Sequence, residues 1–287
     1  MIFKNKLRLN IIVITLIFIS SGIAYEQFSR VSTLQKYKPK GSLVDGLRML
    51  HLDCRGSGTP IFILESGLDT LGSLSWCVVQ DRLAKITRTC AYNRAGIMWS
   101  HPRPYKSNLM EAIANDLNKA LFLTDEKPSY ILVSHSFGGP YITKFTELYG
   151  DNVAGIVFVD SPDPEQIDLV REIEMPLISS ITNKASQVIS RFMNIMGLTR
   201  FINMQDKRRF QNQSDYNSDT IKAFAPLSGD TLNHEISNYS KGLQQVDLFR
   251  NFGQRPMFVL GNIVNYVAMP IQVRYILICV STQSLLS

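Results

Sequence analysis

Five short apolar runs, separated by polar turns and helical stretches, constrain the fold of this chain more than any other feature. The runs show little polar alternation, which is typical of strands buried on both faces of a parallel sheet. Between two of them, leucine or isoleucine recurs at every fourth position from Leu109 to Leu121, which predicts a helix with one apolar face. Strands and helices in alternation predict an α/β fold with a doubly wound, mainly parallel sheet. The five runs are residues 61–64, 90–92, 130–133, 156–159 and 257–260.

The region of residues 165–249 interrupts this rhythm. It contains no strong strand pattern, and an apolar stripe from Ile181 to Ile195 has helical spacing. We therefore expect residues 46–164 and 250–287 to form one core domain, with 165–249 as a helical cap. Such a cap would lie over the carboxyl ends of the strands, where ligands bind in this architecture. The alternative is a helical packing element that contacts no substrate.

The N-terminal residues 1–25 have the pattern of an export signal. Three basic residues, Lys4, Lys6 and Arg8, precede the uncharged segment 9–25. Small residues allow cleavage after Ala24, but the segment also approaches the roughly 20 apolar residues that span a bilayer. Cleaved signal peptide and retained membrane anchor are therefore both open. Either would place the body outside the cytoplasm. A cleaved protein would be periplasmic or extracellular, and an uncleaved one would be anchored in the cytoplasmic membrane and face outward. The polar residues 26–45 are expected to form a linker.

The net charge does not indicate a nucleic-acid partner. Seven basic residues and one acidic residue within residues 1–40 account for the whole formal charge of +6, so the body is neutral. Nucleic-acid binding requires basic residues clustered on the folded domain. Four cysteines would meet an oxidising compartment after export. A bridge from Cys54 to Cys90 and buried free thiols are both compatible with the sequence.

A buried strand, a sharp turn and a helix are predicted around Ser136. The stretch Tyr130–Pro140 reads YILVSHSFGGP, with Ser134 and Gly138 as the small residues two positions before and after the serine. This is the context of a nucleophile elbow, in which the serine has a strained backbone conformation. The backbone N–H of Phe137 would then face the charge that develops on an attacked carbonyl oxygen.

From His51 to Pro164 the sequence resembles a branch of bacterial α/β-hydrolases that are exported serine hydrolases. The shared motifs read HLDCRG at 51–56, ESG at 65–67, CAYNRAG at 90–96 and SHSFGG at 134–139, followed by Val159 and Asp160. The resemblance implies an acyl-enzyme mechanism on Ser136 without a cofactor, and a second oxyanion donor at the N–H of Leu68. Serine at the elbow argues against the dehalogenase and epoxide hydrolase branches, which have aspartate there.

The sequence departs from the family where a base and an acid should follow the serine. A serine hydroxyl is a poor nucleophile at neutral pH unless a base accepts its proton. His234 follows Ser136 in the expected order but lies in the cap region. Asp160, at the end of its strand, is the candidate acid, or else a structural residue. The other three histidines, for which we expect structural roles, are His51, His101 and His135.

Residues 262–287 contain no histidine and no carboxylate. The segment Tyr275–Val280 could still form a last strand. The tail reads as if a shifted reading frame or a shuffled end had replaced the family's ending with unrelated sequence. We therefore expect the last strand and helix to be incomplete. Loss of a triad histidine costs about 10⁶-fold in turnover in a well-studied serine hydrolase.

Two functions follow from the sequence. The first is a serine hydrolase of ester or amide bonds in small molecules, with catalytic residues Ser136, Asp160 and His234. Apolar residues in the cap favour an apolar acyl group. The second is a binding-only or catalytically impaired member of the same fold. No metal-ligand spacing occurs, so no metal site is expected. The cap residues that favour an apolar substrate are Phe192, Met193, Met196 and Phe201.

Overall fold

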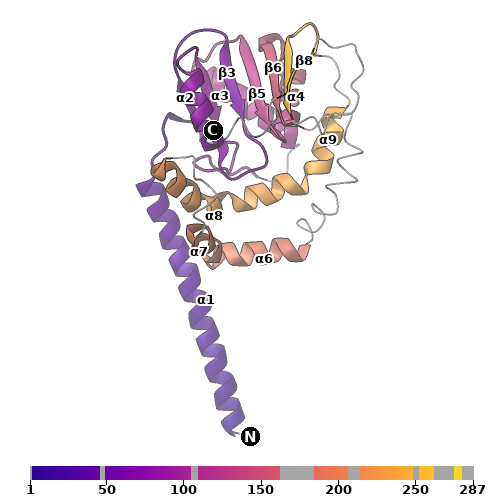
Figure 1. Ribbon diagram of the computed structural model, residues 1–287. Coiled ribbons are helices and arrows are strands. Elements are labelled where there is room, and N and C mark those ends of the chain that lie inside the picture. The colour runs from indigo at the N-terminus through magenta and orange to yellow at the C-terminus, as the bar shows by residue number, and fades with distance from the viewer. Residues whose placement is uncertain are drawn as a thin grey trace.

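A single eight-stranded sheet forms the centre of the molecule, and a long N-terminal helix projects from it (Figure 1). The computed structural model describes residues 2–45, 49–104, 109–161, 184–205, 214–247, 252–261 and 275–279. The strand order is β1-β2-β4-β3-β5-β6-β7-β8. The strands are β1 (Ser42–Val44), β2 (Leu50–Arg55), β3 (Ile61–Glu65), β4 (Thr89–Tyr92), β5 (Tyr130–His135), β6 (Val153–Val159), β7 (Met257–Gly261) and β8 (Tyr275–Cys279).

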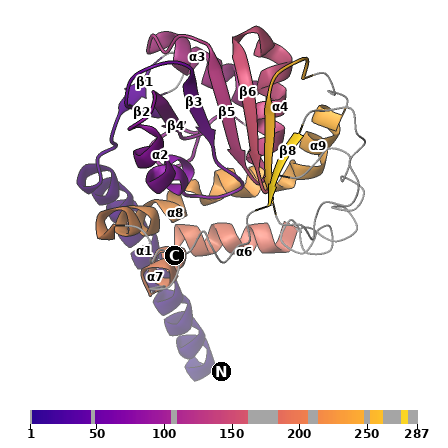
Figure 2. The same ribbon diagram turned by 45° about the horizontal axis from the view of Figure 1, so that its top comes forward.

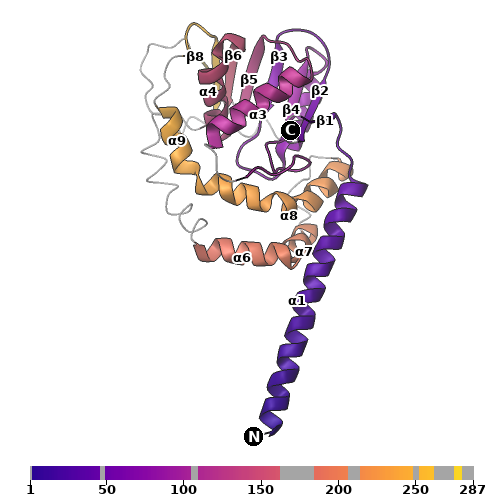
Figure 3. The same cartoon turned by 180° about the vertical axis from the view of Figure 1, so that it is seen from behind.

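The predicted doubly wound, mainly parallel sheet is confirmed. Strands β4, β3, β5, β6, β7 and β8 run parallel to one another, and only the β1–β2 and β2–β4 pairs are antiparallel. Helix α2 (Cys77–Leu83) covers one face, and α3 (Leu109–Leu123) and α4 (Gly138–Tyr149) pack together on the other (Figures 1 and 3). Short 3₁₀ helices, Gly72–Trp76 and Gly150–Asn152, connect these elements.

The apolar runs form the core because each strand is covered on both sides. Ile63, Leu132 and Ile156, on three neighbouring strands, are completely buried in one cluster. The α3 stripe contributes Leu117 and Leu121 to the same cluster, as its spacing predicts. The last strand, β8, pairs with β7 over five residues, and residues 280–287 lie outside the described part of the chain.

In the described part of the chain after β6, four helices come before β7 and lie beyond the strand ends (Figure 2). In Figures 1 and 3, α8 crosses beneath the body, and α6 and α7 lie farther from the sheet. The cap expected over residues 165–249 is thus helical where it is described, although residues 162–183, 206–213 and 248–249 lie outside the description. The helices are α6 (Lys184–Ile195), α7 (Leu198–Gln205), α8 (Asp215–Ser237) and α9 (Tyr239–Asp247).

The apolar stripe of α6 does not face the sheet. Phe192 on α6 and Phe201 on α7 have exposed fractions of 51% and 61%. Met196 is buried, but it lies against Gly22 of the N-terminal helix. The expectation that these residues contact a substrate therefore has no support in the described contacts, because helical periodicity does not say which partner covers an apolar face.

The N-terminal helix α1 (Ile2–Lys36) extends beyond the uncharged segment. The linker expected at 26–45 is therefore helical as far as Lys36, and its end forms β1. Glu26 is buried and its carboxylate pairs with Arg200 of α7, with 3.0 Å between Nε and Oε2. The last part of α1 thus packs against the cap.

Cys54 on β2 and Cys90 on β4 form a disulfide, which decides between the two alternatives that the sequence left open. The two residues face each other in the antiparallel register of these strands. Cys77 is a buried free thiol. The disulfide therefore links the antiparallel edge of the sheet to its parallel centre.

Candidate active site

Ser136 lies at a sharp turn between β5 and α4. Its backbone φ is +49°, a left-handed conformation that is strained for a residue with a side chain. The turn is held on both sides: the Ser136 N–H donates to the Val159 carbonyl at 3.0 Å, and the Gly139 N–H donates to the Ser136 carbonyl at 3.0 Å. The strand, turn and helix predicted around Ser136 are all present.

Small residues allow this turn to pack closely against its neighbours. A Cβ atom on Gly138 would lie 2.8 Å from the Glu65 carbonyl oxygen, which leaves no room for a side chain. Ser134, which stands where the family pattern has glycine, is fully buried and its hydroxyl lies 3.1 Å from that of Ser161. Ser134 thus fits in place of the family's glycine, because its hydroxyl forms a hydrogen bond with Ser161, just after β6.

The loop after β3 lies beside the serine. A Cβ on Gly67 would come within 3.1 Å of the Ser136 Cβ, so the backbone of this loop touches the elbow. The next residue, Leu68, packs into the same apolar cluster as Phe137. Leu68 and Phe137, the two residues expected to supply oxyanion donors, therefore follow two different strands, β3 and β5, and pack in one apolar cluster. That cluster contains Met110, Ile113, Phe137, Tyr141 and Leu243, with Leu68 and Leu109 packed against it.

Arg94 fixes the loop after β3. Its Nη1 donates to the Ser66 carbonyl at 2.8 Å, and its Nη2 donates to the Gly67 carbonyl at 2.7 Å. The same guanidinium forms ion pairs with Glu65 at 2.6 Å and, through two parallel bonds of 2.8 Å, with Glu235 of α8. A bidentate pair of this kind is geometrically specific. Arg94 therefore joins the loop after β3 to the cap.

Glu65 is fully buried in this network. Burial raises the pKa of the Glu65 carboxyl to about 7, although Arg94 and the Tyr92 hydroxyl act to lower it. The Tyr92 hydroxyl donates to Glu65 Oε2. Two carboxylates around one guanidinium leave an excess negative charge, which a proton on Glu65 removes. Sequence reasoning missed this network, although Glu65 and Arg94 both lie within the quoted motifs.

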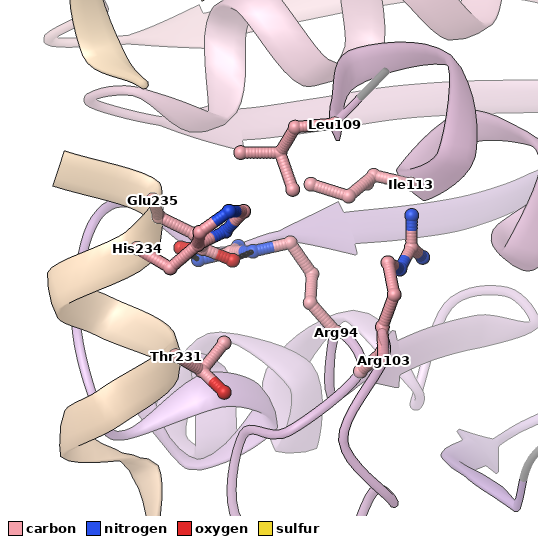
Figure 4. Close-up of a pocket in the computed structure, with 8 residues that line it drawn as sticks. Arg94, Arg103, Leu109, Ile113, Thr231, His234 and Glu235 are labelled. Atoms are coloured by element: carbon pink, nitrogen blue, oxygen red, sulfur yellow. Dashed lines mark hydrogen bonds and ion pairs between the residues drawn. The ribbon is translucent and has the colours of Figure 1, made fainter. Parts of the chain in front are cut away.

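His234 lines a small pocket beside this network (Figure 4). Figure 4 shows His234 and Glu235 on α8, facing Arg94 and Arg103 of the core. Burial lowers the pKa of the His234 imidazole, so its neutral form is favoured. Ser136 is not among the lining residues, which are Arg94, Ala95, Arg103, Leu109, Ile113, Thr231, His234 and Glu235.

Asp160 follows β6 directly, at the strand end next to the elbow. Its φ is +48°, and its N–H donates to the Leu260 carbonyl at 2.7 Å. The side chain is exposed. Among the described residues, no side chain hydrogen-bonds with Ser136 Oγ or with the Asp160 carboxylate. The predicted nucleophile and acid thus follow two neighbouring strands, β5 and β6.

The other three histidines are also placed. His51 is buried in β2, where its Nε2 lies 2.5 Å from the Lys40 carbonyl oxygen and its Nδ1 lies 3.0 Å from Asn93 Nδ2. Burial lowers the pKa of the His51 imidazole. His101 is exposed, and its backbone N–H bonds to the Met49 carbonyl. The His135 ring meets the Trp76 ring edge-on, with 6.5 Å between centroids.

Potential metal ligands gather once in the described part of the chain, at Cys54, Cys90 and Glu126. The disulfide engages both sulfurs, so this group does not offer thiolate ligands.

A parallel sheet with a strained serine between a strand and a helix, and with the loop after β3 packed against that serine, is typical of a hydrolase-type α/β protein. A model of the alpha/beta hydrolase fold matches residues 59–240. The chain belongs to this family.

Solved structures agree with the fold. An epoxide hydrolase of Bacillus megaterium superposes with a TM-score of 0.58 at 17% identity, covering 75% of this chain and 80% of that chain. A haloalkane dehalogenase of Agrobacterium tumefaciens gives 0.56 at 17% identity over 76% and 77% of the two chains. A thermophilic esterase of Thermogutta terrifontis gives 0.50 at 19% identity over 75% of each. These identities show the fold alone.

Two curated proteins share shorter stretches with the chain. One is named probable transporter efuK, from Hormonema carpetanum, and is 31% identical over 110 residues, or 37% of this chain and 16% of that protein. The other is an uncharacterised protein of Schizosaccharomyces pombe, 35% identical over 83 residues, or 29% of this chain and 15% of that protein. The matched stretches thus span about a sixth of these relatives' length.

Proposed function

We propose that this protein is a serine hydrolase that cleaves ester or amide bonds of small substrates through an acyl-enzyme on Ser136. The observation that carries the proposal is the strained elbow, with Ser136 at φ +49° and the backbone of Gly67 against its Cβ. Strain of this kind persists only where the surrounding structure holds it, and it concentrates at functional sites. Here two backbone hydrogen bonds and the packing of Gly138 hold it.

In the proposed reaction, Ser136 Oγ attacks the substrate carbonyl carbon and its proton passes to a base. The N–H groups of Leu68 and Phe137 stabilise the oxyanion of the tetrahedral intermediate. The leaving alcohol or amine takes the proton, and water then hydrolyses the acyl-serine. The apolar cluster that contains both donors favours an apolar acyl group. Arg94 keeps the donor loop in place through the Ser66 and Gly67 carbonyls.

His234 is the proposed base and Asp160 the proposed acid. A neutral imidazole can accept a proton, and burial of His234 favours that form. Direct proton transfer would require His234 and Ser136 to approach within hydrogen-bond distance. The pocket that His234 lines does not have Ser136 among its lining residues, which favours the second candidate function, a binding-only member of the fold.

We also propose that α1 anchors the protein in the cytoplasmic membrane with its body outside. Among the described helices, α1 is long and apolar enough to cross a bilayer, as an N-terminal signal sequence also would be. Basic residues Lys4, Lys6 and Arg8 precede the apolar segment, which favours an inside position for this end. Gly22 lies against Met196 of the cap, and cleavage after Ala24 would remove this contact, which supports retention of the helix.

The test is hydrolysis of short-chain p-nitrophenyl esters by the full chain, compared with Ser136→Ala and His234→Ala. Ser136→Ala should lower kcat/KM by at least about 10³-fold, because the acyl-enzyme cannot form. Ser57→Ala, in an exposed turn, is the matched control and should keep full activity. A comparable loss in His234→Ala would support its role as base. If parent and Ser136→Ala are folded and equally inert, the hydrolase proposal fails and the binding-only function stands.

A further inference from the structure

Within the cap, helix α6 packs against α8 with its polar face. The amide of Gln187 donates to the Ser237 hydroxyl at 3.0 Å, and Ser190 accepts from the Asn233 amide at 3.3 Å. Arg191 pairs with Asp230 at 3.7 Å. All three partners belong to α8, so the polar side of α6 faces α8.

The opposite, apolar face of α6 and α7 is exposed. We define the outer cap face as six residues whose side chains are exposed by 49% to 66%. A helix of a soluble protein normally places its apolar stripe toward the core and its polar residues toward water. The arrangement here is the reverse, and apolar patches of this kind mark interaction surfaces. The six residues are Val188, Ile189, Phe192, Ile195, Phe201 and Ile202.

Contacts with α1 place this face at a defined level along the apolar segment 9–25. The corner between α6 and α7 touches the end of that segment: a Cβ on Gly22 would lie 2.6 Å from Met196 Cε, and one on Gly197 would lie 2.8 Å from the Tyr25 ring. The first charge after the segment, Glu26, pairs with Arg200 of α7. The outer cap face thus lies where α1 would leave the hydrocarbon.

The orientation of the helices fits a membrane plane. In Figures 1 and 3, α6 extends to one side of α1, transverse to it, on the side of α8 from which α1 runs toward its N-terminus. The apolar face of α6, opposite α8, is therefore turned toward the same side. Neither α6 nor α7 contains an acidic residue that headgroup phosphates would repel. Amphipathic helices with these properties lie in the membrane interface.

We propose that the outer cap face binds the bilayer that α1 crosses, with its apolar side chains among the acyl chains just below the headgroups. The inference rests on the proposed membrane anchor and not on the proposed hydrolysis. It makes the cap a peripheral membrane element and places the body close to the lipid surface. Lipid-soluble substrates would then be concentrated beside the cap.

Tryptophan fluorescence in lipid vesicles tests this proposal. The full chain is reconstituted in phosphatidylcholine, with or without bromine near the headgroup end of the acyl chains, because bromine quenches a neighbouring tryptophan. The probe is Phe192→Trp. Phe18→Trp reports on the α1 segment, and Phe122→Trp, 80% exposed at the end of α3, is the matched control. The native Trp76 and Trp99 are buried and give the background, measured on the parent.

Quenching of Phe18→Trp and Phe192→Trp, with Phe122→Trp at background, is the expected result. If Phe18→Trp is quenched and Phe192→Trp is not, the anchor stands and the outer cap face does not enter lipid. An unquenched but blue-shifted Phe192→Trp would mean that protein, such as a second copy, covers the face, which also overturns the proposal. If Phe18→Trp is unquenched, the anchor fails and this inference fails with it. Ester hydrolysis does not enter the readout, so failure of the hydrolase proposal leaves the result unchanged.

Discussion

At the scale of single residues, Arg94 makes more hydrogen bonds and ion pairs within the described site than Ser136, Asp160 or His234, the catalytic residues expected from the sequence. Its guanidinium holds two carbonyls of the donor loop and two carboxylates from separate parts of the chain. One of these partners, Glu235, lies 141 positions away. Removing one partner of a buried pair leaves an uncompensated charge, which is strongly destabilising. The site therefore depends on charges that do not take part in the proposed chemistry.

Glu65→Gln should change how stability depends on pH. The pKa of Glu65 is raised from 4.5 to about 7 in the folded protein. Between these values the folded state binds more protons than the unfolded state, so the stability contribution falls as pH rises. The fall is on the order of 3 kcal/mol. Glutamine keeps the shape without the titration, so this part of the pH dependence should disappear.

Urea unfolding at about pH 4 and about pH 8 measures this effect on parent and variant. Glu147→Gln is the control, because that carboxylate is partly exposed and pairs with Lys144 on the same helix. It should leave the difference between the two pH values close to that of the parent. A Glu65→Gln protein with the parent's full pH dependence would contradict the raised pKa.

At the scale of elements, the disulfide determines how firmly the antiparallel edge is held. The bond between Cys54 and Cys90 closes a loop with a sequence separation of 36. Closure of a loop of this size reduces the entropy of the unfolded chain by an amount worth about 3 to 4 kcal/mol. The double variant Cys54→Ala/Cys90→Ala should lose about that much unfolding free energy. Cys77→Ala, at a buried free thiol, is the control for loss of a sulfur from the core.

Urea denaturation of the three proteins, with and without dithiothreitol, provides the measurement. The reductant should destabilise the parent and Cys77→Ala but not the double variant. An equal effect of reductant on all three would show that the two strands are not bridged in solution.

Elements were the part of the fold that local patterns predicted best. Continuous apolar runs predicted β3 and β5, and the fourfold spacing from Leu109 to Leu121 predicted α3 with its buried face. The α6 stripe was also found, but its orientation was not. Burial of an α3 stripe and exposure of an α6 stripe arise from the same local periodicity, so only the neighbouring elements distinguish them.

At the scale of the whole molecule, α1 and the cap form one unit. The Glu26–Arg200 pair joins residues that are 174 positions apart, and Tyr37 packs in a cluster with Trp99 and Phe224. Cleavage after Ala24 would leave both contacts in place. Export by either route, as a cleaved signal or a retained anchor, is therefore compatible with a docked C-terminal part of α1.

A chain lacking residues 1–24 should unfold at nearly the same temperature as the full chain, and one lacking residues 1–36 should not. The shorter chain leaves Arg200 without Glu26 and uncovers the cap beside α1. A loss of only 1 kcal/mol in unfolding free energy lowers Tm by roughly 2 to 4 °C in a chain of this size. For the chain lacking residues 1–36 we expect a fall in Tm larger than that. Calorimetry of the two forms gives the answer, and equal Tm values would show that α1 does not stabilise the cap.

The sequence by itself determined five strands of the parallel sheet, the α3 helix, the elbow around Ser136 and the apolar segment of α1. These features depend on contacts between residues near in sequence, or on the simple alternation of burial along an element. The tertiary structure alone decided the disulfide, the Arg94 network, the pocket that His234 lines beside that network and the outward face of α6. Each of these depends on which distant segments meet, and spacing along the chain carries no information about that.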